Sequence, residues 1–345
     1  MMMNNTNTAK HSGHALQYGI YTIYIVLGVI QLGGNGLILT VFACTKSLRS
    51  KEYVLPAALA LFDGIVGVGQ LSAGSYRIFL ILVGQDEVLQ SPWECLWKVW
   101  NFCYLICIFG IPTILCLIAI DRLIACASIR VYLRLQTKHM VCFVGLGTTV
   151  WAVLFGTTVY VSYTWSPVVG KIFPQICLTA FTVPRWYQPV FDIYQFSVSM
   201  LTFLLYSLAM SCLWFGGSVD LSDQILAAKH KRQVKVTRML LILMLCGVVL
   251  YTVPVGVVLV NTKATSEVKR IMIPLCWILM NVNSANNVFI YLAKNAEIRS
   301  GARMVWRRLA YKAGGVESIR LSSTNTNIFV QSRHRGVTTQ SSNVI

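Results

Sequence analysis

Charged residues are scarce in this chain of 345 residues. They make up 12% of the sequence, while hydrophobic residues make up 56%. A soluble domain carries about 25% charged residues, so the deficit excludes an ordinary soluble protein and indicates several membrane-spanning segments. Acidic residues are the scarcer sign, with 12 against 29 basic residues and a net charge of +17. The basic residues lie in the gaps between apolar runs, mostly on one side, so we expect a lipid bilayer and not nucleic acid as their partner.

Histidines and catalytic motifs are also sparse. The five histidines lie outside the expected spanning cores, so we expect no metal site at membrane depth. The sequence has no Gly-x-Ser-x-Gly pattern and no paired acids on facing helices, which disfavours an intramembrane enzyme. It shows no inverted repeat and no paired interrupted helices, which disfavours a transporter or channel. No cysteine follows Cys276, which excludes a palmitoylated cytoplasmic tail.

Seven apolar runs are long enough to span a bilayer, which takes about 20 residues. They cover residues 19–43, 54–83, 95–125, 139–165, 187–215, 237–260 and 271–293. The first, third and fifth gaps and the chain after the last run are rich in Lys and Arg, whereas the second gap has neither. By the positive-inside rule, the odd-numbered gaps face the cytoplasm and the N-terminus is extracellular. The sequence therefore predicts an all-α membrane protein of the plasma membrane, with a seven-transmembrane helix bundle over residues 19–293.

The flanking segments predict three further parts. Residues 1–18 are expected to form an extracellular tail with a glycosylation sequon at Asn4. The first apolar run is too long for a cleavable signal, so we interpret it as an anchor that stays. Residues 294–311 predict a short amphipathic eighth helix that lies on the membrane. Residues 312–345, rich in Ser, Thr and Asn, predict a disordered cytoplasmic tail with possible phosphorylation sites.

Asp121 and Arg122 form an adjacent acid and base at the end of the third run. One interpretation is a pair that reaches headgroups and water from the membrane interface. The other is a switch, in which Asp121 holds Arg122 in one state and releases it to a partner in another. Ionisable residues in membrane helices are costly and tend to be functional.

Asp63 lies in the middle of the second run, where a buried carboxylate must be neutral, paired or solvated. Its candidate partners are Asn35 in the first run and a polar cluster in the seventh run. That cluster consists of Asn281, Asn283, Ser284, Asn286 and Asn287. Such a group could hold water or a small cation, or it could serve only as polar contact between helices.

An ordered set of motifs along the runs resembles the rhodopsin-like (class A) family of G protein-coupled receptors. The matching residues are Gly34-Asn35, Leu59 to Asp63, Asp121-Arg122-Leu123, Trp151, Pro254, Asn283-Ser284 and Asn287 to Tyr291. Within that family, the chain resembles the divergent nematode serpentine chemosensory receptors (Srsx-like). The resemblance covers most of residues 19–310. It implies a non-enzymatic receptor that converts binding of an extracellular ligand, a small chemosensory molecule or a peptide, into activation of a heterotrimeric G protein.

The resemblance also implies roles for particular residues. Cys95 and Cys177 would form the disulfide between helix three and the second extracellular loop. A sodium ion near Asp63 would be held by Asn35, Asn283, Ser284 and Asn287. The residues of the activation switch and of G-protein coupling would be Asp121, Arg122, Tyr206, Asn287 and Tyr291.

The ligand pocket is expected in the outer half of the bundle. Its candidate residues are Tyr104, Asp192, Gln195, Tyr251 and Asn281. Tyr104 stands where amine receptors of the family carry an Asp, which disfavours a biogenic amine. Asn281 stands where opsins carry the retinal-binding Lys, which disfavours a photopigment.

The chain departs from the family pattern at several positions. Val288 replaces the helix-seven proline, and Thr252 replaces the switch tryptophan of helix six. No acid is found near the helix-six position that usually locks the arginine, which the motif spacing assigns to Val234. A small transporter or channel, or a receptor-like subunit that does not signal, remains the alternative function.

Overall fold

The computed structural model describes the backbone of residues 3–134, 137–215, 224–260 and 266–313. The chain up to Val305 forms one unit, and a second unit begins at Trp306. The long helices are α1 (Met3–Cys44), α2 (Val54–Leu82), α4 (Val99–Ala127), α6 (Thr137–Val169), α7 (Gln188–Phe215), α8 (Gln224–Gly247), α9 (Val253–Val260), α10 (Ser266–Lys294) and α11 (Ala296–Ala313). The short elements are η1 (Lys46–Leu48), η2 (Lys51–Tyr53), β1 (Leu89–Gln90), α3 (Pro92–Leu96), α5 (Ile129–Arg134), β2 (Phe173–Pro174), η3 (Thr179–Phe181) and the π-helical η4 (Val248–Thr252).

Six helical stretches in the described part of the chain are long and apolar enough to cross a membrane. They are Ala15–Cys44, Lys51–Leu82, Val99–Ala127, Cys142–Val169, Gln188–Trp214 and Gln233–Val260. The seventh predicted run forms α10, which is less apolar because its second half carries four asparagines and a serine. Asn281, Asn283 and Asn287 are buried against the other helices and not exposed to lipid. The predicted seven-helix bundle is therefore confirmed.

Several predicted boundaries were wrong. The predicted tail of residues 1–18 is continuous with α1, which begins at Met3. The sixth helix begins at Gln224 rather than at residue 237, because its first turns are polar and extend beyond the apolar run. The third run is interrupted between α3 and α4. The eighth helix spans Ala296–Ala313 rather than 294–311.

One further expectation is corrected, and two lie outside the part of the chain that the structure describes. The fold is not purely helical, since β1 pairs with β2 in a two-stranded antiparallel sheet. The sequon at Asn4 lies among residues 1–14, whose side chains are outside the described part. Most of the predicted tail, residues 314–345, is also outside it.

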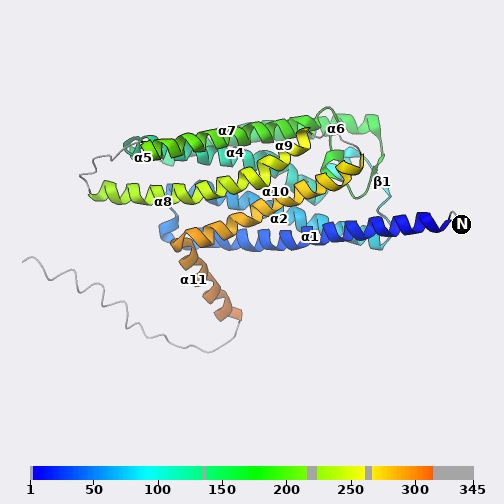
Figure 1. Ribbon diagram of the computed structural model, residues 1–345, viewed down its shortest axis with the longest axis horizontal. Coiled ribbons are helices and arrows are strands. Elements are labelled where there is room, and N and C mark those ends of the chain that lie inside the picture. Colours follow the sequence, from blue (N-terminus) through cyan, green and yellow to red (C-terminus); the bar gives the residue numbers. More distant parts are fainter. Residues whose placement is uncertain (1–2, 135–136, 216–223, 261–265, 314–345) are drawn as a thin grey trace, which may run out of the picture. The chain divides into compact units, whose positions relative to one another are not determined.

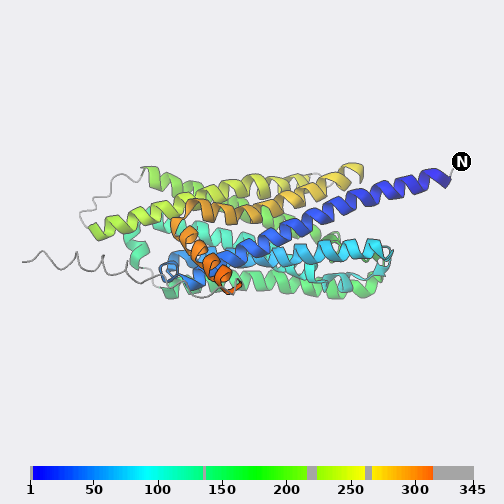
Figure 2. The same cartoon turned by 90° about the horizontal axis from the view of Figure 1, so that it is seen from below.

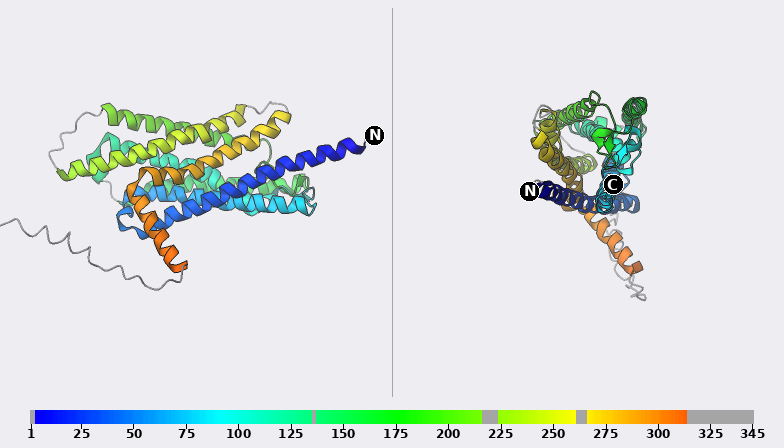
Figure 3. Two further views of the ribbon diagram at one scale, coloured as in Figure 1. Left: turned by 60° about the horizontal axis from the view of Figure 1, so that its bottom comes forward. Right: turned by 90° about the vertical axis from the view of Figure 1, so that its right-hand side faces the viewer.

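The helices of the first unit lie side by side along a common direction (Figures 1 and 2). The first and the last helix of the bundle meet, because α1 packs against α10 as well as against α2. Helix α4 contacts α2, α6, α7 and α8, so it occupies the centre. In the end-on view of Figure 3, the helices surround this interior. The bundle thus has two ends: one with β1 and α3, which we call the disulfide end, and one with α5 and the start of α8, which we call the arginine end (Figure 1).

Glycines allow α1 and α2 to approach closely. A Cβ at Gly28 would lie 2.7 Å from the backbone nitrogen of Leu71, and one at Gly74 would lie 2.7 Å from the carbonyl oxygen of Tyr21. Both distances are too short for a side chain, so the contact requires glycine at these two positions. Small residues serve this purpose in membrane helix pairs, where close backbone approach replaces hydrophobic attraction as the source of stability.

The disulfide end is closed by a covalent bond. Cys95 in α3 is bonded to Cys177, which lies in the chain between α6 and α7. The Cys177 carbonyl oxygen accepts hydrogen bonds from Trp100 Nε1 and Asn101 Nδ2, both at 3.0 Å. Arg77 donates from Nε to the Ile176 carbonyl oxygen at 3.0 Å. The predicted disulfide is confirmed, and these buried donors fix the loop above the bundle.

A capping box and an ion pair order the start of α3. Ser91 Oγ accepts from the Glu94 backbone nitrogen, and Glu94 Oε2 accepts from the Ser91 backbone nitrogen at 2.8 Å. Lys171 Nζ lies 2.8 Å from Glu94 Oε1. The Lys171 ammonium and the Ser91 backbone N–H lower the pKa of the Glu94 carboxyl below its usual range.

We expect Lys171→Ala to destabilise the fold by less than about 1 kcal/mol, because both partners of the pair are at least partly exposed. A carboxyl whose pKa is lowered by folding contributes stability above its unfolded pKa and loses it as the pH falls through the folded pKa. The difference in melting temperature between the variant and the native chain should therefore vanish in acid. Arg185→Ala, which removes an exposed arginine from the same end, is the control. A difference that persists once Glu94 is protonated would contradict the assignment.

Candidate functional site

Arg122 is the most deeply buried charged residue of the arginine end. It lies in the last two turns of α4 and is 0% exposed, while Asp121 is 7% exposed. Arg122 Nε donates to Asp121 Oδ2 at 2.9 Å, and Nη2 contacts the same oxygen. A guanidinium taken out of water needs a counter-charge and satisfied N–H groups, and the adjacent carboxylate supplies the first.

Two other elements accept further hydrogen bonds from Arg122. Nη1 donates to Gln233 Oε1 in α8 at 2.8 Å. Nη2 donates to the Tyr132 hydroxyl in α5 at 3.1 Å. Burial raises the pKa of the Tyr132 phenol, so this hydroxyl stays protonated. The arginine therefore ties α4 to α8 and to the segment that follows α4.

The short helix η2 extends this network from the first loop. Gln233 Nε2 donates to Glu52 Oε1 at 2.5 Å. Lys51 Nζ donates to the Tyr132 carbonyl oxygen at 2.8 Å and lies 4.2 Å from the centre of its ring. We call Glu52, Gln233, Arg122, Asp121 and Tyr132 the arginine network. No acid of α8 contacts Arg122 among the described residues. Instead, the neutral amide of Gln233 bridges Arg122 to the carboxylate of Glu52 in η2.

Asp63 is fully buried in the bundle, where α2 faces α10. Its Oδ2 accepts from Asn287 Nδ2 at 2.8 Å, and Ser284 also donates to the carboxylate. Asn35 lies beside α2, with its Cβ 3.9 Å from the position of a Cβ on Gly64. The Oδ1 atoms of Asp63, Asn35 and Asn287 are buried and have no hydrogen-bond partner among the described residues. An all-oxygen donor set with one carboxylate fits a hard cation such as sodium.

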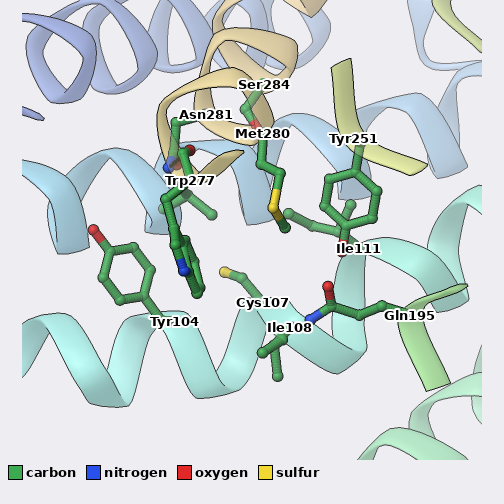
Figure 4. A pocket seen from close by; sticks show the side chains of 11 residues that line it. Tyr104, Cys107, Ile108, Ile111, Gln195, Tyr251, Trp277, Met280, Asn281 and Ser284 are labelled. Atoms are coloured by element: carbon green, nitrogen blue, oxygen red, sulfur yellow. Dashed lines mark hydrogen bonds between the residues drawn. The ribbon is translucent and has the colours of Figure 1, made fainter. Parts of the chain in front are cut away.

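A cavity of about 410 Å³, including its open mouth, lies nearer the disulfide end. It is lined by Val66, Tyr104, Cys107, Ile108, Ile111, Gln195, Tyr251, Trp277, Met280, Asn281 and Ser284. Figure 4 shows Gln195 and Tyr251 entering from one side, opposite Tyr104 and Trp277. Among the residues that the structure describes, none of those lining the cavity is charged. Its mix of aromatic and polar groups is typical of a small-molecule site. We call it the upper cavity.

The sequence comparison decides the family. Residues 25–306 match the family model described as serpentine type 7TM GPCR chemoreceptor Srsx. The chain belongs to this receptor family. The matched segment runs from α1 into α11 and includes both the arginine network and the upper cavity. The family is one of chemosensory receptors and not of enzymes. No curated protein sequence matches the receptor.

The structure brings most of the predicted site residues of the receptor together. Of the five pocket candidates, Tyr104, Gln195, Tyr251 and Asn281 line the upper cavity. Asp192 does not, because it lies one turn along α7 from Gln195 toward the disulfide end. Of the predicted cation ligands, Asn283 lines a second cavity instead of joining Asp63.

The tyrosines expected to meet Arg122 are buried, and no hydrogen bond joins either of them to Arg122 among the described residues. Tyr206 and Tyr291 are 1% and 0% exposed, and neither hydroxyl has a partner among the described residues. Helix α10 runs without interruption through Val288. The side chain of Val288 fills the space at Gly34, since a Cβ there would lie 2.9 Å from both of its methyl groups. With valine in place of the proline, α10 continues as a helix through Val288, and the Val288 side chain packs directly against Gly34 of α1.

Sequence reasoning missed Gln233, Glu52 and Tyr132 of the arginine network. It assigned the lock position of helix six to Val234, but the hydrogen bond to Arg122 comes from Gln233. The available signal was the glutamine itself, a lone amide in the basic segment 229–235. Trp277, which lies in the upper cavity one turn before Asn281, was also missed.

Proposed function

We propose that this receptor converts binding of a small uncharged ligand in the upper cavity into activation of a heterotrimeric G protein at the arginine end. In this proposal the disulfide end and the N-terminus are extracellular and the receptor lies in the plasma membrane. The excess of basic residues in the odd-numbered gaps supports this orientation. The observation that carries the proposal is the arginine network, which joins α4 and α8 at the opposite end from the upper cavity.

The arginine network favours the resting state. Moving α8 away from α4 would break the Arg122–Gln233 hydrogen bond, and moving it away from η2 would break the Gln233–Glu52 bond. A hydrogen bond to a charged group contributes about 1.5–3 kcal/mol, so the resting arrangement is preferred without being permanent.

The active state releases Arg122 toward the cavity opened by α8. Tyr206 and Tyr291 supply unpaired hydroxyls that would stabilise the new position of the arginine and face the G protein. Ligand in the upper cavity shifts this equilibrium because Gln195, Tyr251 and Trp277 belong to α7, η4 and α10, which must move with α8. The free energy of this shift can be no larger than the difference between the ligand's binding free energies for the two states.

The lining of the upper cavity supports an uncharged ligand. It offers the hydroxyls of Tyr104 and Tyr251 and the amides of Gln195 and Asn281, but no acid or base. A buried charge without a partner is strongly unfavourable, so a charged ligand would lose affinity there. We infer a neutral molecule with one or two hydrogen-bonding groups and an apolar body.

Asp63, Asn35, Ser284 and Asn287 are proposed to hold a sodium ion, whose charge would balance the buried carboxylate. Asp63→Asn should then abolish the dependence of receptor stability on sodium. The measurement compares melting temperatures in sodium chloride and in N-methylglucamine chloride at equal ionic strength. Stabilisation by sodium that is equal in the native chain and in the variant would contradict the site.

The function is tested by nucleotide exchange. Membranes containing the receptor and a promiscuous G protein are exposed to a panel of neutral volatile compounds, and binding of a non-hydrolysable GTP analogue is measured. Stimulation that is lost with Gln195→Leu, which removes the amide without emptying the cavity, supports the proposal. A transporter, a channel or a non-signalling subunit predicts no receptor-dependent exchange with any compound.

Glu52→Gln should raise basal exchange by about two- to tenfold. The substitution keeps a hydrogen-bond acceptor for Gln233 but removes the negative charge, which halves the strength of such a bond, a loss of about 0.5–1.5 kcal/mol. Glu297→Gln is the matched control, because it removes an exposed carboxylate from the same end. Equal basal exchange in both variants would show that Glu52 has no part in the resting state.

A further inference from the structure

A second cavity lies directly below the upper one, on the side of the arginine end. Its space between atoms, counted together with the part open to solvent, is about 350 Å³. Helices α4, α7 and α10 and the π-helical η4 line both cavities, whereas α2 lines only the upper one and α8 only the lower one. Along the shared helices the lining residues are shifted by one turn: Ile111 is followed by Leu115 in α4, and Gln195 by Ser199 in α7. One turn of four residues corresponds to about 6 Å along the helix axis. Tyr251 belongs to both walls, so the two cavities are neighbours. We call the second one the lower cavity.

The lower cavity combines an apolar wall with unpaired polar atoms. Leu115, Leu243 and Val248 supply apolar surface. Ser199 and Asn283 are 8% and 5% exposed, and neither Ser199 Oγ nor Asn283 Oδ1 has a hydrogen-bond partner among the described residues. Buried polar atoms without partners are rare in folded proteins and call for an occupant.

The backbone around the lower cavity leaves room for such an occupant. A Cβ on Gly247 would lie 3.9 Å from Asn283 Oδ1 and would meet no other atom within 4 Å. Gly247 thus faces the amide oxygen across open space. Thr252, at the end of the π-helical η4, also lines the cavity with a small side chain.

We propose that the lower cavity is a second ligand subsite, which takes the hydroxyl-bearing end of an elongated neutral ligand whose other end lies in the upper cavity. Asn283 Oδ1 can only accept a hydrogen bond, while Ser199 Oγ can donate or accept. A hydroxyl group satisfies both atoms at once. A carboxylate cannot donate to Asn283, and an ammonium would find no acid in the wall. This inference rests on the proposed function, because it extends the same ligand site.

The consequence is selection by chain length. A short alcohol fits one cavity, whereas a chain of about eight carbons spans both. The longer chain buries additional methylene groups, each contributing roughly 0.8 kcal/mol when fully removed from water.

Thiol modification tests the subsite without knowledge of the natural ligand. Cys107 is a native cysteine of the upper cavity, and Thr252→Cys places a thiol in the lower one. The receptor is held in lipid nanodiscs and treated with methyl methanethiosulfonate, and each cysteine is followed by mass spectrometry of its peptide. The exposed native Cys142 is the internal control for reagent and for partitioning into lipid.

The proposal predicts that both cavity thiols react and that 1-octanol slows both reactions, while 1-butanol, octanoate and octylammonium leave the lower thiol unprotected. Ser199→Ala should weaken protection of the lower thiol by 1-octanol about fivefold, as expected for one lost neutral hydrogen bond. Gly247→Ala should weaken it through steric exclusion.

Each other outcome is decisive. Modification of Cys107 without modification of the lower thiol shows a closed lower cavity and overturns the subsite alone. Reaction of both thiols with no protection of the lower one by 1-octanol shows that it holds only water, which also overturns the subsite. Failure of both thiols to react shows that the upper cavity is inaccessible, and it contradicts the proposed function as well.

Discussion

Replacing Arg122 with alanine is expected to reduce receptor-dependent nucleotide exchange, basal and stimulated, by at least about tenfold. The arginine network places this guanidinium where four elements meet, α4, α5, α8 and η2 by way of Gln233. An alanine cannot reach Tyr206 or Tyr291, so the active arrangement loses its central contact. A loss of about 1.4 kcal/mol already corresponds to a factor of ten, and charged hydrogen bonds exceed that value.

The alanine variant alone leaves Asp121 buried without a counter-charge, which costs about 3–5 kcal/mol and endangers folding. The double variant Asp121→Asn/Arg122→Ala removes both charges and avoids this penalty. Arg238→Ala, at an exposed position of α8, is the matched control. Native-like surface expression of the double variant with full exchange activity would disprove the role of Arg122.

Removing the disulfide is expected to cost about 2–5 kcal/mol of stability, because the bridge closes a long loop. Cys95 and Cys177 are 82 residues apart in the sequence. Cys177 also has a φ of 44°, which is unfavourable for a residue with a side chain. Once the bond is absent, Cys177 can relax, and Trp100 and Asn101 lose their acceptor.

The variant Cys95→Ser/Cys177→Ser should therefore show a lower melting temperature and weaker surface expression. Cys142→Ser, which removes an exposed free cysteine, is the control. Treating the native chain with a reducing agent should lower its melting temperature by a similar amount. An unaltered melting temperature in the double variant would show that the buried hydrogen bonds alone hold the loop.

The fold was predictable because its determinants are local. A membrane helix is predicted by a run of about 20 apolar residues, which a single stretch of sequence contains in full. The errors occurred where helices extend beyond the apolar runs, as in the first turns of α8, since polar helical turns carry no hydropathy signal. The break between α3 and α4 was missed for the opposite reason, because apolar residues continue through it.

The site was predictable in part. Asp63, Asp121 and Arg122 were found because each is an ionisable residue within an apolar helix, and Tyr104 and Asn281 were found through the resemblance. Gln233 and Glu52 were missed because their role depends on tertiary placement: η2 brings a carboxylate to α8 across 181 positions of sequence. The lower cavity was missed because empty space has no sequence signature.

The central claim is that the hydrogen bond between Gln233 and Arg122 restrains the receptor in its resting state. The most direct test is basal nucleotide exchange by Gln233→Ala and by Gln233→Ala combined with Asp121→Asn/Arg122→Ala. Loss of one charged hydrogen bond, about 1.5–3 kcal/mol, shifts the equilibrium between the two states by roughly ten- to 150-fold. We predict that basal exchange rises strongly in the single variant and falls to background in the combined one. Basal exchange that stays at the native level in Gln233→Ala, or that stays raised after Arg122 is removed, would contradict the account.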